Sequence, residues 1–413
     1  MSTTSSATPE PKYIAWNQVE REHLNPLVDR EMVYGQQLML ARVFLKKDGH
    51  VPLHHHHNEQ LTYILEGALK FARAATGRAG IVSLHSGYHG LSYGSLSVTG
   101  IPNFQEGFGP LMAETARVKL GDLGALERLL QKRNVAAFLV EPVQGKGVKF
   151  PKNDFFIQAQ SLCRKYGTLF VCDEVQTGLG RTGKWWGFEH WNLEPDIVTV
   201  AKSLSGGFVP CGAIVTRRAI YQKVFNRLDR CVVHSSTFGR NNLAMACGLA
   251  SLAILDDEKL VEQSARIGNL LVERLDALRP KHTFLKEIRG KGLMIAIEFH
   301  EPPELGLKTA WRLLHKIDKA LFPQLVIVPL LSKHRVLTQV AGHNMDVIKI
   351  LPPLMIGERE VDYFVKAFDE TLTACRRFPG PMLELAMNTA RKNKNGRRPA
   401  PSGYRRPVIA NSR

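Results

Sequence analysis

Short apolar runs alternate with amphipathic stretches through the middle of the chain. Runs rich in valine, isoleucine and phenylalanine predict buried strands at residues 135–140, 168–172 and 197–201, and an earlier run leads from Gly80 toward Tyr88. Helical spacing predicts helices at residues 125–132 and 155–166. Strands that alternate with helices are typical of a mostly parallel sheet with helices on both faces, so we expect an α/β fold between residues 81 and 215.

The remaining patterns predict a smaller second domain and a strand-rich start. Two long helices are expected at residues 241–255 and 259–278, followed by strands at 288–299, 326–331 and 348–350 and a last helix at 360–372. Residues 32–49 predict two strands and a turn. The stretch EQLTYILEG is ambiguous, because it alternates like a strand, whereas a family resemblance given below implies a helix at residues 66–78.

The net charge of +17 is concentrated at one end of the chain. Residues 391–413 hold eight basic side chains, no acidic one, and many prolines, glycines, serines and asparagines, so they predict a disordered basic tail. This tail leaves +9 for the other 390 residues, which argues against a nucleic-acid partner.

The chain also lacks an apolar run long enough to span a membrane, and it shows no signal peptide. Its six cysteines show no C-x-x-C spacing, and buried thiols suit a reducing compartment. We therefore expect a cytoplasmic protein.

Two charged residues follow predicted strands and could meet at the carboxyl edge of the sheet, where open α/β folds bind ligands: Asp173 and Lys202. A lysine with a lowered pKa can act as a nucleophile. An acid opposite a pyridine nitrogen keeps that nitrogen protonated, so the ring accepts electrons. The two residues are therefore the minimal pair for pyridoxal phosphate, although the same types also occur as an ordinary cap and a solvated charge.

Four motifs in order make the prediction specific: EPVQG from Glu141, CDEVQTGLGRTG from Cys172, EPDIVTVAKSLSGG from Glu194 and HSSTFG from His234. Together they resemble class III aminotransferases, which are fold-type I pyridoxal-phosphate enzymes, over residues 68–378. The resemblance implies a homodimeric aminotransferase. It would move an amino group from an amine or ω-amino acid donor to a 2-oxo acid acceptor.

The resemblance also implies the roles of individual residues. Lys202 would form the aldimine with pyridoxal 5'-phosphate and then carry the proton between substrate and cofactor carbons, while Asp173 would hold the pyridine nitrogen. Six further residues would complete the cofactor site: Tyr88 stacked on the ring, His89 beside it, Val175 on the opposite face, Gln176 at the ring hydroxyl, Glu141 of the EPVQG motif, and Thr237 at the phosphate of the partner subunit's cofactor.

Two substrate-side positions depart from the family pattern. Many members carry an arginine before the Pro-Pro pair and a second glutamate after the EPxQG motif, but this chain has Lys349 and Lys146 there. A lysine is a point charge and lacks the planar fork of an arginine. His334 and Arg335 are further candidates for contact with an anion. The donor stays open: an ω-amino acid, a polyamine or another primary amine.

The N-terminal region differs from the rest. GHVPLHHHHNEQLTYILEG resembles the first metal motif of the cupins, in which His54, His56 and Gln60 would be ligands on one strand face. The second cupin motif is missing, so the motif predicts no complete metal site. In the aminotransferase family, a Ser-Gly pair at the start of the helix binds the cofactor phosphate. Here those positions hold Gln60 and Leu61.

We therefore expect a fusion with five segments: a disordered start (1–12), a partial cupin-like β segment (13–67), a pyridoxal-phosphate-binding large domain (68–280), a small α+β domain (281–378) and a basic tail (379–413). Three alternatives to an aminotransferase remain. They are an aminomutase on the same fold, a chain with a broken phosphate site and no catalysis, and a metal-binding cupin.

Overall fold

The computed structural model describes residues 20–25, 28–34, 39–45, 59–236, 239, 241–316 and 318–376; for residues 22–64 within this set it describes the backbone only. The chain divides into an N-terminal unit up to His57 and a main unit from Asn58 onward. The N-terminal unit contains an antiparallel sheet of three strands in the order β1 (Arg21–Asn25), β2 (Val28–Tyr34) and β3 (Met39–Leu45). Its second and third strands confirm the two strands predicted within residues 32–49, while the predicted turn lies outside the described residues.

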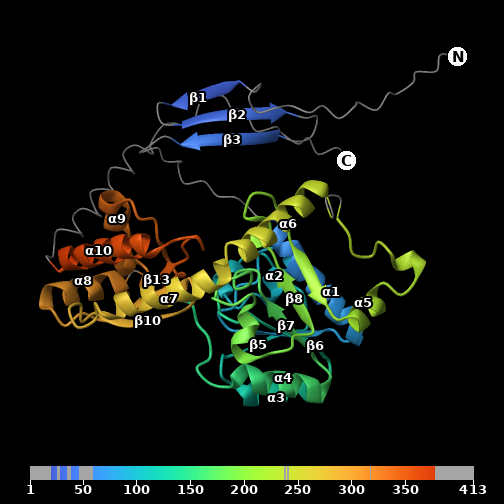
Figure 1. The fold of residues 1–413 in the computed structure, drawn as a ribbon. Coiled ribbons are helices and arrows are strands. Elements are labelled where there is room, and N and C mark those ends of the chain that lie inside the picture. Colours follow the sequence, from blue (N-terminus) through green and yellow to red (C-terminus); the bar gives the residue numbers. More distant parts are fainter. Residues whose placement is uncertain are drawn as a thin grey trace, which may run out of the picture. The chain divides into compact units, whose positions relative to one another are not determined.

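The main unit contains a six-stranded sheet with the order β5-β4-β6-β7-β8-β9 (Figure 1). The first five strands in this order are parallel, and the last is antiparallel. The strands are β4 (Gly80–Leu84), β5 (Thr115–Val118), β6 (Val135–Val140), β7 (Leu169–Asp173), β8 (Ile197–Val200) and β9 (Ala213–Thr216). The mostly parallel α/β sheet predicted from the alternating pattern is therefore present.

Helices cover both faces of this sheet (Figure 1). One face packs on α3 (Leu123–Leu130) and α4 (Phe155–Tyr166), and the other on α1 (Glu59–Thr76) and α5 (Arg218–Val224). Successive residues of β6 serve opposite cores, because Phe138 and Val140 join the first while Ala137 and Leu139 join the second. Burial on both faces explains why these strands are uniformly apolar.

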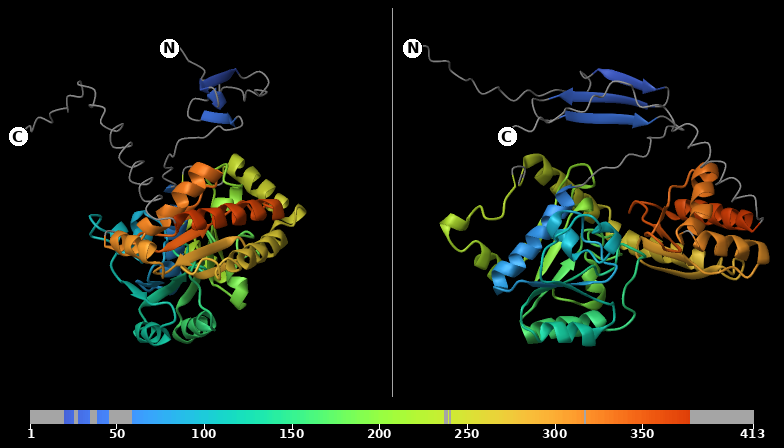
Figure 2. Two further views of the ribbon diagram at one scale, coloured as in Figure 1. Left: turned by 90° about the vertical axis from the view of Figure 1, so that its left-hand side faces the viewer. Right: turned by 180° about the vertical axis from the view of Figure 1, so that it is seen from behind.

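A second sheet forms the small domain, with the order β10-β11-β13-β12, all antiparallel. Its strands are β10 (Leu285–Lys291), β11 (Met294–Phe299), β12 (Gln339–Val340) and β13 (Val347–Ile350). Helices α7 (Leu260–Asp276), α8 (Leu305–His315), α9 (Leu321–His334) and α10 (Glu358–Cys375) share one core with it. Figure 2 shows α8 to α10 (orange to red) lying together.

The other helices are α2 (Tyr93–Val98), α6 (Asn242–Asp257) and four short 3₁₀ helices: η2 (Pro102–Phe104), η3 (Gly187–Trp191), η4 (Lys202–Ser205) and η5 (Leu228–Arg230). Within the described ranges, no helix is both long enough and apolar enough to cross a membrane.

The ambiguous stretch at residues 59–67 is helical, so the alternative of a cupin strand carrying Gln60 is wrong. The physical reason lies in the spacing of the apolar positions. Leu65, Ala68, Leu69 and Ala72 repeat at helical intervals, and all four are buried against the sheet. This packing continues through α1, and it prevails over the local alternation.

The strand predicted at residues 326–331 is also wrong, because this run lies within helix α9. The helix is apolar on nearly every side, and Phe322, Leu325, Val326 and Leu330 are buried in the small-domain core. A short, continuously apolar run with β-branched residues does not distinguish a buried strand from a buried helix.

Candidate active site

Four neighbouring strand ends place the predicted residues at the carboxyl edge of the parallel sheet. Strand β4 leads to Tyr88 and His89, β6 to Glu141, β7 ends at Asp173, and β8 leads to Lys202. The strands are adjacent in the order β4-β6-β7-β8, so residues far apart in sequence come together. This is the edge at which open α/β sheets bind ligands.

Asp173 lies at the centre of the group and is 5% exposed. One oxygen, Oδ2, is 2.8 Å from Nδ1 of His89; the other, Oδ1, accepts hydrogen bonds from the Thr199 hydroxyl at 3.1 Å and the Val175 backbone N–H at 3.2 Å. Burial disfavours the charged form of His89, but the bond to Asp173 and the nearby carboxylates outweigh it and raise the His89 pKa. Asp173 is thus held in one orientation.

Glu141 is the second buried carboxylate of the site, and its oxygens are also occupied. Oε2 accepts the backbone N–H of Tyr88 at 2.9 Å, and Oε1 accepts that of Gly145 at 2.8 Å. Burial raises the pKa of Glu141, and the charge of Asp173 adds to the effect. Glu141 therefore joins the loop after β4 to the loop after β6.

Lys202 follows β8 at the first position of η4, with a φ of +50°. A non-glycine residue in this left-handed region is strained, and such strain often occurs at functional sites. As a whole the residue is exposed, yet burial of its amine lowers the pKa of that amine, while Asp173 and Glu141 oppose this effect. The Lys202 amine thus lies within the electrostatic influence of two carboxylates.

Tyr88, Val175 and Gln176 are partly buried around this centre. The Tyr88 ring meets Phe104 edge-on at 5.6 Å between centroids. A Cβ atom at Gly145 would lie 2.5 Å from Oε1 of Gln176, so only glycine leaves this side chain its place. These three predicted residues are therefore brought to the same edge of the sheet as Asp173 and Lys202.

Two further lysines, which we call the lysine pair, belong to the same group: Lys146 and Lys349. Lys349 lies on β13, is 8% exposed, and donates from Nζ to the backbone oxygen of Gly145 at 3.1 Å. Nζ of Lys146 lies 5.3 Å from the centre of the Tyr88 ring and 5.5 Å from that of Phe104. The departures noted in the sequence are thus part of the site.

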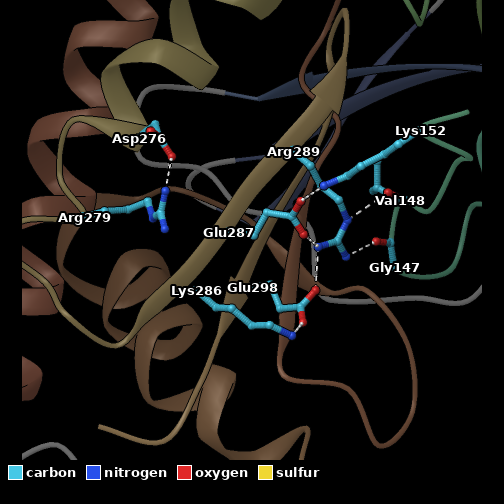
Figure 3. Close-up of polar contacts among 9 residues, drawn as sticks. All are labelled: Gly147, Val148, Lys152, Asp276, Arg279, Lys286, Glu287, Arg289 and Glu298. Carbon is cyan, nitrogen blue, oxygen red and sulfur yellow. Dashed lines mark hydrogen bonds and ion pairs between the residues drawn. The ribbon is translucent and has the colours of Figure 1, made fainter. Parts of the chain in front are cut away.

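An arginine of the small domain fixes the loop that carries Lys146 (Figure 3). Arg289 of β10 donates to the backbone oxygens of Gly147 at 2.6 Å and Val148 at 3.1 Å. Its guanidinium also pairs with Glu287 at 3.0 Å and Glu298 at 2.5 Å. The loop after β6 is therefore held from the small-domain sheet as well as by Glu141.

The donor set suits pyridoxal phosphate. It offers a lysine amine with a lowered pKa, a buried acid aligned by three donors, and a neighbouring aromatic ring. Nε2 of His89 is buried and has no hydrogen-bond partner among the described residues, so it is left to face a ligand or water.

Three sequence-predicted positions lie outside the described residues: Thr237, His54 and His56. Gln60 lies in the first turn of α1. The two extra anion candidates, His334 and Arg335, end α9, where Tyr363 of α10 donates to the His334 backbone oxygen at 2.6 Å. The structure thus places them beside α10.

Sequence reasoning missed three residues that hold the site together. Thr199 bonds Asp173, the Thr99 hydroxyl accepts the backbone N–H of His89 at 3.1 Å, and Glu174 accepts the backbone N–H groups of Gly187 and Phe188. Burial raises the pKa of Glu174 to about 7. The threonine in the otherwise apolar strand IVTV was a signal, because a polar residue in a buried strand needs a partner.

Comparison with known proteins agrees with this geometry. The family model for aminotransferase class-III matches residues 62–372. Aminotransferase PigE of Serratia sp. is 34% identical over 360 residues, which cover 80% of this chain and 41% of that protein. Ornithine aminotransferase 1 of Staphylococcus aureus is 35% identical over 334 residues, which cover 79% of this chain and 76% of that protein.

Among solved structures, the fold is similar to that of an amine transaminase from an uncultivated Pseudomonas species in its PLP-bound form. The two chains are 28% identical with a TM-score of 0.67, and the match covers 76% of this chain and 75% of the other. The chain thus spans less than half of the length of PigE and about three quarters of the other two proteins.

Proposed function

Because the chain belongs to the class III aminotransferases and is a pyridoxal-phosphate-dependent transaminase, we propose that its catalytic centre is built on Lys202 and Asp173. The reaction moves an amino group from an amine donor to a 2-oxo acid acceptor. The observation that supports this centre most directly is the position of Lys202, which follows β8 and whose amine lies within the influence of the buried Asp173 carboxylate.

Pyridoxal phosphate supplies an aldehyde that takes up the amine and a pyridine ring that draws electrons from the substrate carbon. Nζ of Lys202 would hold the cofactor, then take the proton from the carbon that bears the amino group and return it at the cofactor carbon. Asp173 would hold a proton on the pyridine nitrogen, and its contact with His89 keeps it oriented for this.

The other predicted residues would orient the ring. Tyr88 would stack on one face and Val175 on the other, Gln176 would reach the ring hydroxyl, and His89 would lie beside the ring. Glu141 supports them, because it bonds the backbone of Tyr88. These roles rest on the family resemblance and on the placement of all five residues at one edge of the sheet.

We place the cofactor phosphate at the start of α1 and at Thr237 of the second subunit. Helix α1 ends at Thr76, just before the amino end of β4, so its start lies toward the carboxyl edge of the sheet. Near that edge Glu66 accepts the backbone N–H of Gly94 at 2.7 Å. The free amides of a helix start suit a phosphate, and here Gln60 and Leu61 would supply them in place of the family's Ser-Gly pair.

A homodimer follows from the same proposal, and exposed apolar side chains support it. Phe208 is 89% exposed, Leu228 92% and Leu249 71%, and all three lie between η4 and the middle of α6. Several large apolar side chains exposed along one stretch of the chain are more than a single scattered residue and favour an interface. A second copy of this chain would cover them.

For the remaining segments, we propose the partial cupin-like fusion at residues 13–67, with α1 shared as the first helix of the large domain. The large domain would then run to residue 280 and the small domain to 378, with basic residues 379–413 as a tail. The β1–β3 sheet supports a β-rich start. We also propose a cytoplasmic location, from the absence of C-x-x-C pairs in a chain with six cysteines.

The visible absorption spectrum of the full chain with pyridoxal phosphate tests this function. We expect a bound-cofactor band that an amine donor bleaches, that Lys202→Ala abolishes, and that the exposed control Lys132→Ala retains. Recovery of the bleached band when a 2-oxo acid is added would distinguish amino transfer from an aminomutase reaction. A wild-type chain without the band would refute the proposed centre and favour a fusion without catalysis.

A further inference from the structure

Two half-buried cysteines lie beside the segment that carries Lys202. Cys211 follows this segment in the chain, and Cys247 lies on helix α6. Both are free thiols, whereas each of the other four cysteines is either buried or exposed. A half-buried thiol stays within reach of solvent while the surrounding packing limits its movement, and partly exposed thiols in a defined environment are the ones that react selectively.

One face of α6 packs on the 3₁₀ helix η4, and Cys247 belongs to that face. The Ser251 hydroxyl donates to the backbone oxygen of Ser203 in η4 at 2.8 Å. Cys247 lies one helical turn before Ser251, so the two side chains point to the same side of α6. Leu249 lies two positions after Cys247, points away from this side and is 71% exposed. A second copy of the chain that covers Leu249 therefore leaves Cys247 on the side of η4.

The chain after η4 folds back and brings Cys211 to the same contact. The Ser205 hydroxyl donates to the Val209 backbone oxygen, which closes the turn that leads to Cys211. Two residues after Cys211, Ala213 begins β9 and packs in one apolar cluster with Leu252 of α6. The chain thus reaches α6 directly beyond Cys211.

The two thiols also influence each other electrostatically. Burial raises the pKa of Cys211, and the negative charge that Cys247 carries when ionised raises it further. A charge effect between two side chains requires that they lie near each other, because the interaction weakens with distance. Cys211 and Cys247 are therefore neighbours at the contact between α6 and the segment that includes η4.

We propose that Cys211 and Cys247 form a redox-active dithiol, which an organic hydroperoxide converts into a disulfide within one chain. One thiolate attacks the peroxide, the O–O bond breaks, and the departing alkoxide takes up a proton and leaves as an alcohol, so that this sulfur becomes a sulfenic acid. The second thiolate attacks the same sulfur, the S–S bond forms and the S–O bond breaks, and the hydroxide takes up a proton to give water. The sulfurs together lose two electrons to the peroxide, and both protons come from the thiols.

The disulfide acts on Lys202 through η4, and this part of the inference rests on the proposed function. Lys202 occupies the first position of η4 with a φ of +50°. A disulfide holds its two Cα atoms about 4.4–6.8 Å apart, so it sets the separation between α6 and the segment after η4. Because a small displacement of a catalytic group lowers the rate of reaction, we expect oxidation to slow turnover.

Peptide mapping of the full chain tests the dithiol. The reduced protein is treated with tert-butyl hydroperoxide at pH 8, free thiols are blocked with iodoacetamide, and the digest is analysed by mass spectrometry without reduction. We expect a linked pair of peptides that contain Cys211 and Cys247, in protein that runs as a single chain on a non-reducing gel. The link should persist in the control Cys231→Ser, which removes an exposed thiol, and disappear in Cys247→Ser.

Turnover gives a second readout. Oxidation should lower kcat/KM of wild type about threefold or more, and dithiothreitol should restore it. Cys231→Ser should respond to the hydroperoxide as wild type does. In Cys211→Ser and Cys247→Ser the same treatment should change kcat/KM less than about twofold, because a single thiol of the pair cannot form the link.

Links that contain Cys231, or links only between two chains, would overturn the dithiol. So would free thiols at Cys211 and Cys247 in a sample whose Cys231 is oxidised. A linked pair with unchanged turnover would overturn the effect on Lys202. If wild type lacks the absorption band that depends on Lys202, the catalytic centre fails, while the peptide map still tests the dithiol.

Discussion

The two carboxylates of the site and its lysine pair differ in how their charges are satisfied. Every oxygen of Asp173 and Glu141 accepts a hydrogen bond from the protein, and both side chains are buried. Lys146 and Lys349 are equally part of the crevice, but they have a carbonyl and two aromatic rings as partners instead of an acid. The carboxylates are pre-organised, whereas neither lysine is paired with an acid among the described residues.

The largest effect should come from removing the charge of the pre-organised acid. Asp173→Asn keeps the size of the side chain but cannot hold a proton on a pyridine nitrogen, so we expect kcat/KM to fall about 10²–10³-fold. Steady-state kinetics with a fixed donor and acceptor would measure it. The control Asp196→Asn alters an acid at the start of β8 that binds the Phe170 backbone, and it should retain most activity. Equal losses in both variants would indicate a structural role for Asp173.

The second-largest effect concerns Arg289, which holds the loop after β6 (Figure 3). Arg289 is 11% exposed and bonds two acids and two backbone oxygens, so Arg289→Met should lower the free energy of unfolding by about 2–4 kcal/mol. Lys152 pairs with the same Glu287 but is 79% exposed, and Lys152→Met should cost less than about 0.5 kcal/mol. Urea unfolding measures both. Similar losses would mean that Arg289 contributes no more than a surface ion pair.

Substitution in the lysine pair should change the free energy of unfolding in the opposite direction. Burial of the pair without an anion costs stability, so Lys349→Met should raise the free energy of unfolding of the unliganded chain at pH 7 by about 1–2 kcal/mol. The pKa of Lys349 is about 8 in the folded chain and near 10.5 when exposed. The unfolded state therefore binds more protons between these values, and wild type gains stability as pH rises through this window.

The difference in free energy of unfolding between Lys349→Met and wild type should therefore become smaller from pH 8 to pH 10. Urea unfolding at pH 7, 8, 9 and 10 would measure it, with Lys132→Met as the control that shows no such trend. A variant that is less stable than wild type at pH 7 would mean that the bond to Gly145 outweighs the cost of the buried charge, and the contrast with the carboxylates would be lost.

The sequence predicted correctly those helices and strands whose hydrophobic period matches the faces that are buried in the structure. The strand at residues 135–140 and the helix at 155–166 appear with those bounds, because each apolar position faces a core that the pattern already indicates. The helix α9 and the start of α1 were mispredicted or ambiguous, since their apolar residues are explained only by a core assembled from distant segments. The hydrophobic period of a segment does not show which distant segments will cover it.

For the site, the sequence identified the residues that follow strand ends but not those that hold them. Asp173 and Lys202 stood out because charge follows an apolar run. Arg289 could not be found in this way, since its backbone partner Val148 lies far along the chain. Thr99 lies only 10 residues from His89, but it follows no strand end, and only the folded loop shows that the two residues meet. Lys146 and Lys349 were noticed as departures, but their shared burial was visible only in the structure.

The smallest predicted effect tests how much the acid depends on its neighbours. Thr199 is fully buried, and its hydroxyl donates to Oδ1 of Asp173 at 3.1 Å, so Thr199→Val removes one hydrogen bond at nearly constant volume. We expect a loss of about 1 kcal/mol in stability and a fall of about three- to tenfold in kcat/KM. The valine at the neighbouring position, Val198, gives the control Val198→Ile, which leaves the bond in place. If Thr199→Val matches wild type in kcat/KM, His89 and the Val175 backbone are enough to orient the carboxylate, and the pre-organisation on this side is redundant.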